Sequence, residues 1–261
     1  MNFAVAPGFE MDALKKSRVV ASVEARMSST RLPGKVLSDI AGRPALLRLL
    51  DRLQRATMLD AIVVATTDRP ADDPLVRAVE AAGIRCYRGS EEDVLNRVVQ
   101  AHRMMGTELV VEVTGDCPLI DPVVIDLGVT TFLANAVDVV ANVVKPSYPM
   151  GIDVQVFPLT ALAEVEASVR DPAVRQHVSL FFYEHPERYR IMHLLAPERY
   201  HAPELRLQLD YLEDQQLICE IYRRLEPKFG NSFGTPEILE LLAAEPALAE
   251  INRHCTEKAP R

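Results

Sequence analysis

Short apolar runs alternate along the first half of the chain with segments in which apolar residues recur every three or four positions. The runs predict strands, and the periodic segments predict amphipathic helices. The expected strands are residues 19–24, 61–66, 84–88 and 108–114. The expected helices are residues 44–56, 73–83, 90–105 and 121–134. Because parallel strands joined by helices are covered on both sides, the pattern predicts an α/β fold with a mostly parallel sheet and helices on both faces.

Local signals mark several helix ends. Gly83 is expected to close the second helix, because glycine readily adopts the left-handed conformation that follows a helix. Ser90, with Asp93 three residues later, has the pattern of a capping box and predicts a helix that starts at Ser90. Asp121 is expected to cap the fourth helix, with Pro122 in its first turn.

The second half of the chain is more mixed. Strands are expected at residues 151–157, 189–195 and 205–210, and helices at residues 172–185 and 211–225. No internal repeat and no linker divides the chain. We therefore expect residues 18–261 to form a single domain, preceded by a disordered extension at residues 1–17.

Composition narrows the classes of function. The 261 residues include 29 basic and 37 acidic side chains, a net charge of −8, which argues against binding nucleic acid through its phosphates. The chain has no Trp and 6% aromatic residues, which argues against a stacking platform for single strands. The four cysteines lack C-x-x-C spacing, and no window approaches 18 apolar residues. We expect reduced thiols, no membrane span and a cytoplasmic protein.

A basic loop follows the first expected strand. Arg26, Arg31 and Lys35 come close together, with Ser28 and Ser29 between them, and no acid interrupts residues 25–38. Guanidinium and ammonium groups suit phosphate oxygens. The spacing matches neither the P-loop nor the dinucleotide-binding fingerprint. The segment is therefore either a phosphate-binding loop of another kind or a solvated surface loop.

Two carboxylates follow other expected strands. Asp116 comes after an apolar strand and a glycine, where it could reach the crevice beyond the strand ends or stabilise a turn. Asp210 precedes an expected helix and could be its cap or a metal ligand. Magnesium bound to phosphates needs only one or two protein carboxylates, so both interpretations stay open for each residue.

Four further polar residues are candidates. Asp153 and Gln155 alternate with apolar residues, so they share one face of an expected strand, where they could be functional or merely solvated. Arg175 and His177 are two positions apart in an expected helix, so they do not point the same way. A lone histidine is more often structural than catalytic, and spacing alone assigns none of the four a role.

Several segments together resemble the cytidylyltransferases that make CMP-activated sugar acids. EARMSSTRLPGKVLSDIAGRP is similar to their opening motif A-R-x-x-S-x-R-x-P-x-K. TGDCPLIDPVVID, YPMGIDVQVF, RQHV and QLDYLEDQQL are similar to later blocks, in the same order. The nearest likeness is to the branch named after the spore coat polysaccharide biosynthesis protein SpsF, and it spans residues 19–225.

The resemblance implies a Rossmann-like sheet of the kind found in nucleotide-diphospho-sugar transferases. It implies transfer of CMP from CTP to an acidic 2-keto sugar of the sialic, legionaminic or Kdo type, with release of pyrophosphate, for synthesis of a surface polysaccharide or glycan. A homodimer is also implied by the family, and residues 142–150, with two prolines, could be an exchanged arm.

The same resemblance assigns roles to the candidate residues. The residues implied to bind the nucleotide are Arg26, Ser28, Ser29, Arg31 and Lys35. Lys35, Arg26 and Asp116 are implied to be catalytic, and Asp116 and Asp210 to hold Mg²⁺. The residues implied to bind the sugar are Asp153, Gln155, Arg175 and His177.

Three positions depart from the family pattern. Glu24 stands where a neutral residue is usual, and Ser28 where glycine is common. LDYLED, residues 209–214, replaces the usual D-T-P-E-D. An acid beside a phosphate loop would lower nucleotide affinity unless it points away or helps to bind metal. Two other functions stay open. One is a nucleotidyltransferase that joins another nucleotide, such as GTP, to a sugar 1-phosphate, because backbone contacts often select the base. The other is a non-catalytic nucleotide-binding relative.

Overall fold

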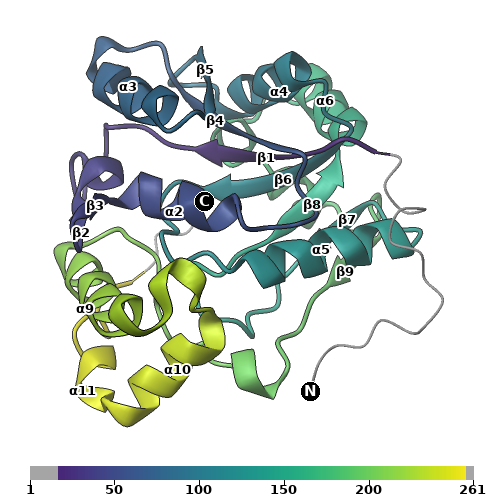
Figure 1. Ribbon diagram of the computed structural model, residues 1–261. Helices are drawn as coiled ribbons and strands as arrows, with labels where there is room; N and C mark the ends of the chain where they lie inside the picture. Colours follow the sequence, from purple (N-terminus) through teal and green to yellow (C-terminus); the bar gives the residue numbers. More distant parts are fainter. Residues whose placement is uncertain (1–16, 257–261) are drawn as a thin grey trace.

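The computed structural model describes residues 17–256. Its centre is a seven-stranded sheet in the order β5-β4-β1-β6-β8-β7-β9 (Figure 1). The strands are β1 (Val19–Glu24), β4 (Ala61–Thr67), β5 (Arg85–Gly89), β6 (Leu109–Thr114), β7 (Val139–Ala141), β8 (Gln155–Pro158) and β9 (Ile191–His193). Neighbouring strands are parallel except that β8 runs antiparallel to β6 and β7. The predicted fold class is confirmed.

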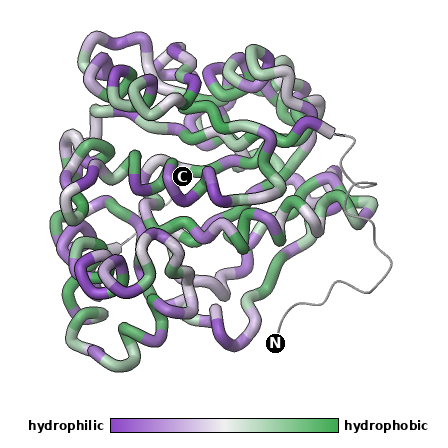
Figure 2. The backbone as a smooth tube through the Cα atoms, in the orientation of Figure 1, coloured by the Kyte–Doolittle hydropathy of each residue, from purple (hydrophilic) through white to green (hydrophobic). Residues whose placement is uncertain are grey.

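Helices cover both faces of this sheet (Figure 1). One face packs against α4 (Val94–Met105), α6 (Leu159–Ser168) and α8 (Leu180–Glu184). The other packs against α2 (Ala45–Leu53), α3 (Asp73–Ala81) and α5 (Pro122–Ala134). Successive side chains of β1 point to opposite faces of the sheet. Val19, Ala21 and Val23 therefore pack in the buried cluster on one face, and Val20 packs in the cluster on the other face. Figure 2 shows hydrophobic residues along these central strands.

A helical cap lies below α2 at the lower left of Figure 1. It consists of α9 (Leu212–Phe229), α10 (Thr235–Ala244) and α11 (Pro246–Ala249), with α9 against the small antiparallel pair β2 (Asp39–Ile40) and β3 (Arg43–Pro44). The short helix α7 (Pro172–Gln176) precedes α8. The helices α6 and α10 were not among the elements predicted from the sequence.

Several expected boundaries are wrong. The helix expected from Ser90 begins at Val94, because the Asp93 carboxylate caps it by accepting a hydrogen bond from the Asn96 amide at 3.0 Å. The helix expected at 172–185 is interrupted after α7, where His177 adopts an extended conformation. The strand expected at 205–210 makes only an isolated bridge, between Arg206 and Met150. The strand expected at 151–157 is confined to β8.

Other expectations are confirmed at the level of single residues. Asp121 caps α5 by accepting a hydrogen bond from the Val123 amide at 2.9 Å. Gly83 follows α3 with a φ of 75°. All four cysteines are free. The predicted extension lies, apart from Ser17, outside the described residues.

Residues 142–150 pack largely on their own chain. The Asn142 side chain donates to the Ile152 carbonyl at 2.7 Å and accepts from the Val154 amide at 2.8 Å. The Tyr148 ring lies edge-on to Tyr200 with 6.0 Å between centroids. Only the tip, residues 144–146, is exposed within this segment. Its role as a dimerisation arm stays a prediction.

Candidate functional site

The basic loop after β1 is held in shape by hydrogen bonds. The buried Asp72 carboxylate accepts from the Met27 amide at 2.7 Å, and the Gly34 amide donates to the Met27 carbonyl at 3.0 Å. Gly34 has a φ of 73°, in the left-handed region that disfavours a side chain, so this turn into the short 3₁₀ helix Lys35–Leu37 favours glycine. Asp72 was not among the predicted site residues, because no motif marks an acid that supports a loop 45 residues away.

Lys35 joins three segments that are far apart in the sequence. Its Nζ lies 2.9 Å from Asp116 Oδ2 and 2.7 Å from Asp210 Oδ1. The Leu209 amide donates to the Asp116 carbonyl at 2.8 Å, which holds the two acid-bearing segments together. Arg31 Nη2 also lies 2.7 Å from Asp210 Oδ1. The structure therefore brings together four of the predicted residues at the carboxyl ends of β1 and β6.

The pKa values at this cluster favour charged groups. Burial alone would lower the pKa of Lys35, but Asp116 and Asp210 outweigh burial and raise it. Burial alone would raise the pKa of Asp116, but Lys35 and hydrogen bonds from Lys35, Thr114 and Gln208 lower it. The raised pKa of Lys35 and the lowered pKa of Asp116 both favour the charged forms of these two groups at neutral pH.

The two carboxylates fit a magnesium ion. Asp116 and Asp210 each direct a carboxylate oxygen at the same cationic group, the Lys35 ammonium. The two carboxylates are therefore already oriented to bind one positive charge together. Carboxylate oxygens are the hard ligands that Mg²⁺ prefers, and phosphates and water complete its shell. A separate group, Glu213, His254 and Cys255, has ligand atoms within 4.8 Å of one another, but its nitrogen and sulfur ligands suit softer metals.

The remaining loop residues are paired more loosely. Arg26 Nη1 lies 3.8 Å from Glu91 Oε1, and Ser28 Oγ donates to the same oxygen at 2.8 Å. Ser29 Oγ accepts from the Leu32 amide at 3.3 Å. The Arg26 guanidinium therefore faces a carboxylate, that of Glu91. Glu91 was not a candidate, since the sequence shows it only as one acid near an expected helix start.

Two adjoining cavities bring most of the predicted residues together. The first has a volume of about 400 Å³, and we call it the nucleotide cavity after the residues that the sequence resemblance implies to bind a nucleotide. Its lining includes Arg26, Ser28, Ser29, Arg31, Lys35 and Asp116. The second, which we call the acceptor cavity, has a volume of about 380 Å³ and is lined in part by Asp153 and Gln155. Thr114 and His177 line both cavities, so the two spaces meet at these residues.

Arg175 lies apart from the other predicted sugar-binding residues. It lines neither the nucleotide cavity nor the acceptor cavity. Its guanidinium forms ion pairs with Asp93 and with Glu166, the latter at 3.3 Å, and so ties α7 to α4 and α6. These contacts favour a structural role.

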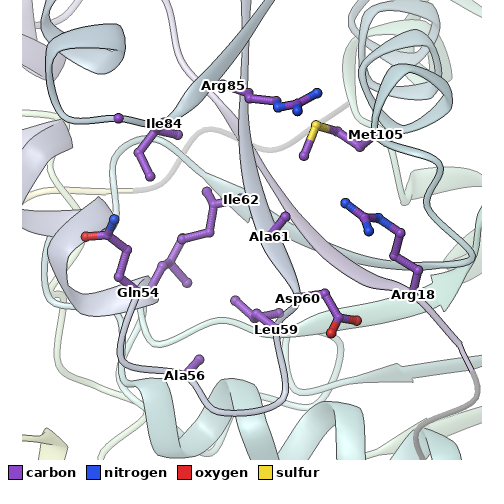
Figure 3. Close-up of a pocket in the computed structure, with 12 residues that line it drawn as sticks. Arg18, Gln54, Ala56, Leu59, Asp60, Ala61, Ile62, Ile84, Arg85 and Met105 are labelled. Carbon is purple, nitrogen blue, oxygen red and sulfur yellow. The ribbon is translucent and has the colours of Figure 1, made fainter.

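A further cavity of about 420 Å³ lies at the opposite ends of the strands (Figure 3). Figure 3 shows Arg18, Asp60 and Arg85 around it, which come from the starts of β1, β4 and β5. None of the predicted site residues lines it. In parallel α/β sheets, ligands bind at the carboxyl ends of the strands. This cavity lies at the other ends of the strands, so we do not include it in the candidate site.

The unusual acid Glu24 lines the nucleotide cavity. Its Oε1 accepts from Ser22 Oγ at 2.9 Å. Burial and the neighbouring Glu112 raise the pKa of Glu24 well above its usual value. The raised pKa favours the uncharged form of Glu24, and that form does not repel a triphosphate.

Residues 209–214 differ from the family pattern, but hydrogen bonds still stabilise the start of α9. The Asp214 carboxylate is fully buried and accepts from the backbone amides of Asp210 and Tyr211 at 2.8 and 2.9 Å. Arg206 donates to Asp214 and also lies 2.7 Å from Asp210 Oδ2. Asp210 is thus oriented from two sides even though the usual D-T-P-E-D is missing.

Comparisons with known proteins point to one family. Residues 20–241 match the family model described as Cytidylyltransferase. The chain is 32% identical over 232 residues to the spore coat polysaccharide biosynthesis protein SpsF of Bacillus subtilis, covering 87% of this chain and 95% of that protein. It is also 32% identical over 248 residues to the 3-deoxy-manno-octulosonate cytidylyltransferase of Anaeromyxobacter dehalogenans, covering 87% and 98%.

The fold comparison agrees. The solved structure of a cytidylyltransferase from Leptospira borgpetersenii superposes with a TM-score of 0.85 at 26% identity, covering 93% of this chain and 100% of that one. The resemblance noted in the sequence is confirmed. Within residues 17–256, no helix has the length and apolar character needed to cross a membrane.

Proposed function

The chain belongs to the cytidylyltransferase family, and we propose that it transfers CMP from CTP to a hydroxyl group of a sugar, with release of pyrophosphate. The observation that supports this most is the cluster of Lys35, Asp116 and Asp210, in which Lys35 and Asp116 line a cavity that meets a second one. A transferase needs two such adjoining spaces, because donor and acceptor must be held with the reacting atoms in contact.

In this proposal the nucleotide cavity binds CTP. Arg26, Arg31 and Lys35 exchange their carboxylate partners for triphosphate oxygens, and Ser28 and Ser29 offer hydroxyls on the same loop. Asp116 and Asp210 would hold Mg²⁺, which when bound neutralises phosphate charge and orients the triphosphate. The raised pKa of Glu24 favours its uncharged form at the side of the cavity.

The reaction is an in-line displacement at the α-phosphorus. The acceptor oxygen forms a bond to the α-phosphorus, the bond from that phosphorus to the bridging oxygen of the β-phosphate breaks, and the electron pair leaves with pyrophosphate. Lys35 and Arg26 stabilise the charge that builds on the phosphates. The hydroxyl proton must leave, and His177, which lines both cavities, lies where an imidazole could accept it.

Nucleotide binding is the first test. CTP, UTP, GTP and ATP would each be added with and without Mg²⁺, and the thermal stability of the protein measured. A ligand at 100 times its dissociation constant stabilises a protein by about 2.7 kcal/mol. We expect a magnesium-dependent shift for CTP that is lost in Arg26→Ala. A shift for GTP alone would favour transfer to a sugar 1-phosphate, and no shift for any nucleotide would refute the phosphate-binding role of the loop.

Turnover tests the catalytic roles. Lys35→Ala and Asp116→Ala should each lower the rate of pyrophosphate release by at least ~10²–10³, because each removes a group that stabilises developing charge. Lys228→Ala, at an exposed lysine of α9, is the matched control and should retain the wild-type rate. Near-normal turnover in either site variant would contradict its role. Pyrophosphate release with any sugar would exclude the non-catalytic alternative.

Finer features of the family stay predictions. The resemblance favours an acidic 2-keto sugar as acceptor, a role in polysaccharide synthesis, a homodimer and a cytoplasmic location. Sedimentation that shows only monomer at micromolar concentration would refute the dimer. The identity of the acceptor depends on the chemistry of the acceptor cavity.

A further inference from the structure

We propose that Glu213, His254 and Cys255 together bind one Zn²⁺ ion, at a site separate from the two cavities of the proposed reaction. Glu213 lies in the first turn of α9, and His254 and Cys255 are neighbours close to the end of the described chain. The structure brings ligand atoms of all three side chains within 4.8 Å of one another. The inference does not depend on the proposed function, because other residues form the site.

The three donor atoms match the ligands of zinc. They are a carboxylate oxygen, an imidazole nitrogen and the sulfur of a free cysteine. Zn²⁺ binds these three kinds of atom, usually with four ligands in a tetrahedron, and a site with three protein ligands leaves the fourth position to water. Mg²⁺ and Ca²⁺ instead prefer sites made of oxygen alone. The mixed set of donors therefore favours zinc over these two ions.

The separations fit one ion shared by three ligands. His254 Nε2 lies 3.7 Å from Glu213 Oε1, which is too long for a direct hydrogen bond. Zinc bonds of about 2.0–2.3 Å place the ligand atoms of a tetrahedron about 3.3–3.8 Å apart. The pair of His254 and Glu213 already has this spacing, and the limit of 4.8 Å for the whole group leaves about 1 Å to be closed.

The side chains can make that adjustment, because they are accessible. The His254 side chain is 69% exposed and that of Glu213 is 39% exposed. Cys255 is half-buried and lines a cavity of about 410 Å³, together with Arg206 and Asn252. A metal ion can therefore reach the thiol from solvent, and the cavity has room for a water molecule on the metal.

Charge at the site also favours a divalent cation. Burial raises the pKa of the Cys255 thiol, and the carboxylates of Asp214 and Glu213 raise it further against the opposing effect of Arg206. The same two carboxylates attract a cation for the reason that they disfavour a bare thiolate. When zinc binds, the thiol loses its proton to solvent. The thiolate and the Glu213 carboxylate then balance the two charges of the ion.

Hydrogen bonds hold the two halves of the site together on both sides of the adjacent histidine and cysteine. On one side, the Asn252 side chain donates to the Arg206 carbonyl at 2.9 Å and to Asp214 Oδ1 at 2.8 Å. On the other, the Tyr211 hydroxyl donates to the Thr256 carbonyl at 3.2 Å. The ligands are thus brought together before a metal arrives, which lowers the entropy lost on binding.

Zinc binding by the full chain can be measured directly, without nucleotide. The protein is treated with a chelator, dialysed against a slight excess of ZnCl₂, and its metal content is determined. We expect one zinc ion per chain, and we expect it to be retained in a large excess of Mg²⁺, because Mg²⁺ disfavours sulfur and nitrogen ligands. No retained zinc, or zinc that Mg²⁺ displaces, would overturn the inference.

Cys255→Ser and His254→Gln test the ligands. Each should weaken zinc binding at least ~10²-fold, since even loss of a residue that only supports a ligand costs about 10–100-fold. His201→Gln, at an exposed histidine outside the group, is the matched control and should bind zinc as the wild type does. Serine differs from cysteine by one atom, so Cys255→Ser should fold normally. Unchanged zinc affinity in Cys255→Ser or in His254→Gln would contradict the site.

Cobalt identifies the bound sulfur. Co²⁺ accepts the ligands that Zn²⁺ accepts, and a thiolate bound to it produces a charge-transfer absorption band in the near ultraviolet. We expect this band in the wild type and in His201→Gln, and its loss in Cys255→Ser. A wild-type protein that binds Co²⁺ without the band would refute the role of the thiolate. Because CTP is absent from these measurements, their failure is distinguishable from failure of the proposed function.

Discussion

Replacement of Glu112 by glutamine tests the buried polar row beneath the two cavities. Ser22, Glu112 and Gln155 lie side by side on β1, β6 and β8. Glu112 is 5% exposed, and its Oε2 has no hydrogen-bond partner. Burial raises the pKa of Glu112 from 4.5 to about 7. The neutral acid is therefore favoured in the folded protein, and glutamine imitates that form.

The sign of the effect follows from proton binding. The unfolded chain loses the Glu112 proton near pH 4.5, whereas the folded protein keeps it to about pH 7. Between these values the folded state binds more protons, so the free energy of unfolding falls as pH rises and levels off above pH 7. At 1.36 kcal/mol for each pH unit, the difference corresponds to about 3 kcal/mol. Glu24, whose pKa is also raised, acts in the same direction.

Urea unfolding between pH 4.5 and pH 8.5 would measure this. Glu112→Gln should remove up to about 3 kcal/mol of the pH dependence and should be more stable than the wild type at pH 8. Glu108→Gln, at an exposed glutamate just before the same strand, should leave the pH dependence as it is. If the Glu112→Gln and wild-type curves run parallel, or if the variant is less stable at pH 8, the account of a protonated buried acid is refuted.

Two other substitutions test how the site is held. Gly115→Ala would place a Cβ 2.7 Å from the Glu24 carbonyl and 2.9 Å from Ala25 Cβ, so we expect β1 and β6 to be pushed apart at the nucleotide cavity. Thermal shift should show weaker CTP binding, and wild-type affinity would contradict the close approach. Arg175→Ala breaks the ion pairs with Asp93 and Glu166 and should destabilise folding by roughly 1–3 kcal/mol without changing KM for the sugar. A raised KM with unchanged stability would instead make Arg175 a sugar-binding residue.

Hydrophobic patterning determined the first half of the fold. The strands β1, β4, β5 and β6 and the helices between them were predicted because apolar runs and helical periodicity are local properties of the chain. The second half was predicted less well. Strand 205–210 and the continuous helix 172–185 did not form, since Asp214 binds the backbone at Asp210 and His177 leaves the helical conformation. Long-range contacts override local propensity in such segments.

The candidate site divides in the same way. The sequence by itself determined the cations and hydroxyls of the loop at residues 26–35, the acid Asp116 after β6, and the family to which the chain belongs. Only the tertiary structure decided that Lys35 lies between Asp116 and Asp210, although Asp210 is 175 residues from Lys35 in the sequence. Only the tertiary structure placed Arg175 outside both cavities. The physical reason is that a charge takes its partner from whatever the packed strands bring near it, and sequence spacing does not record that distance.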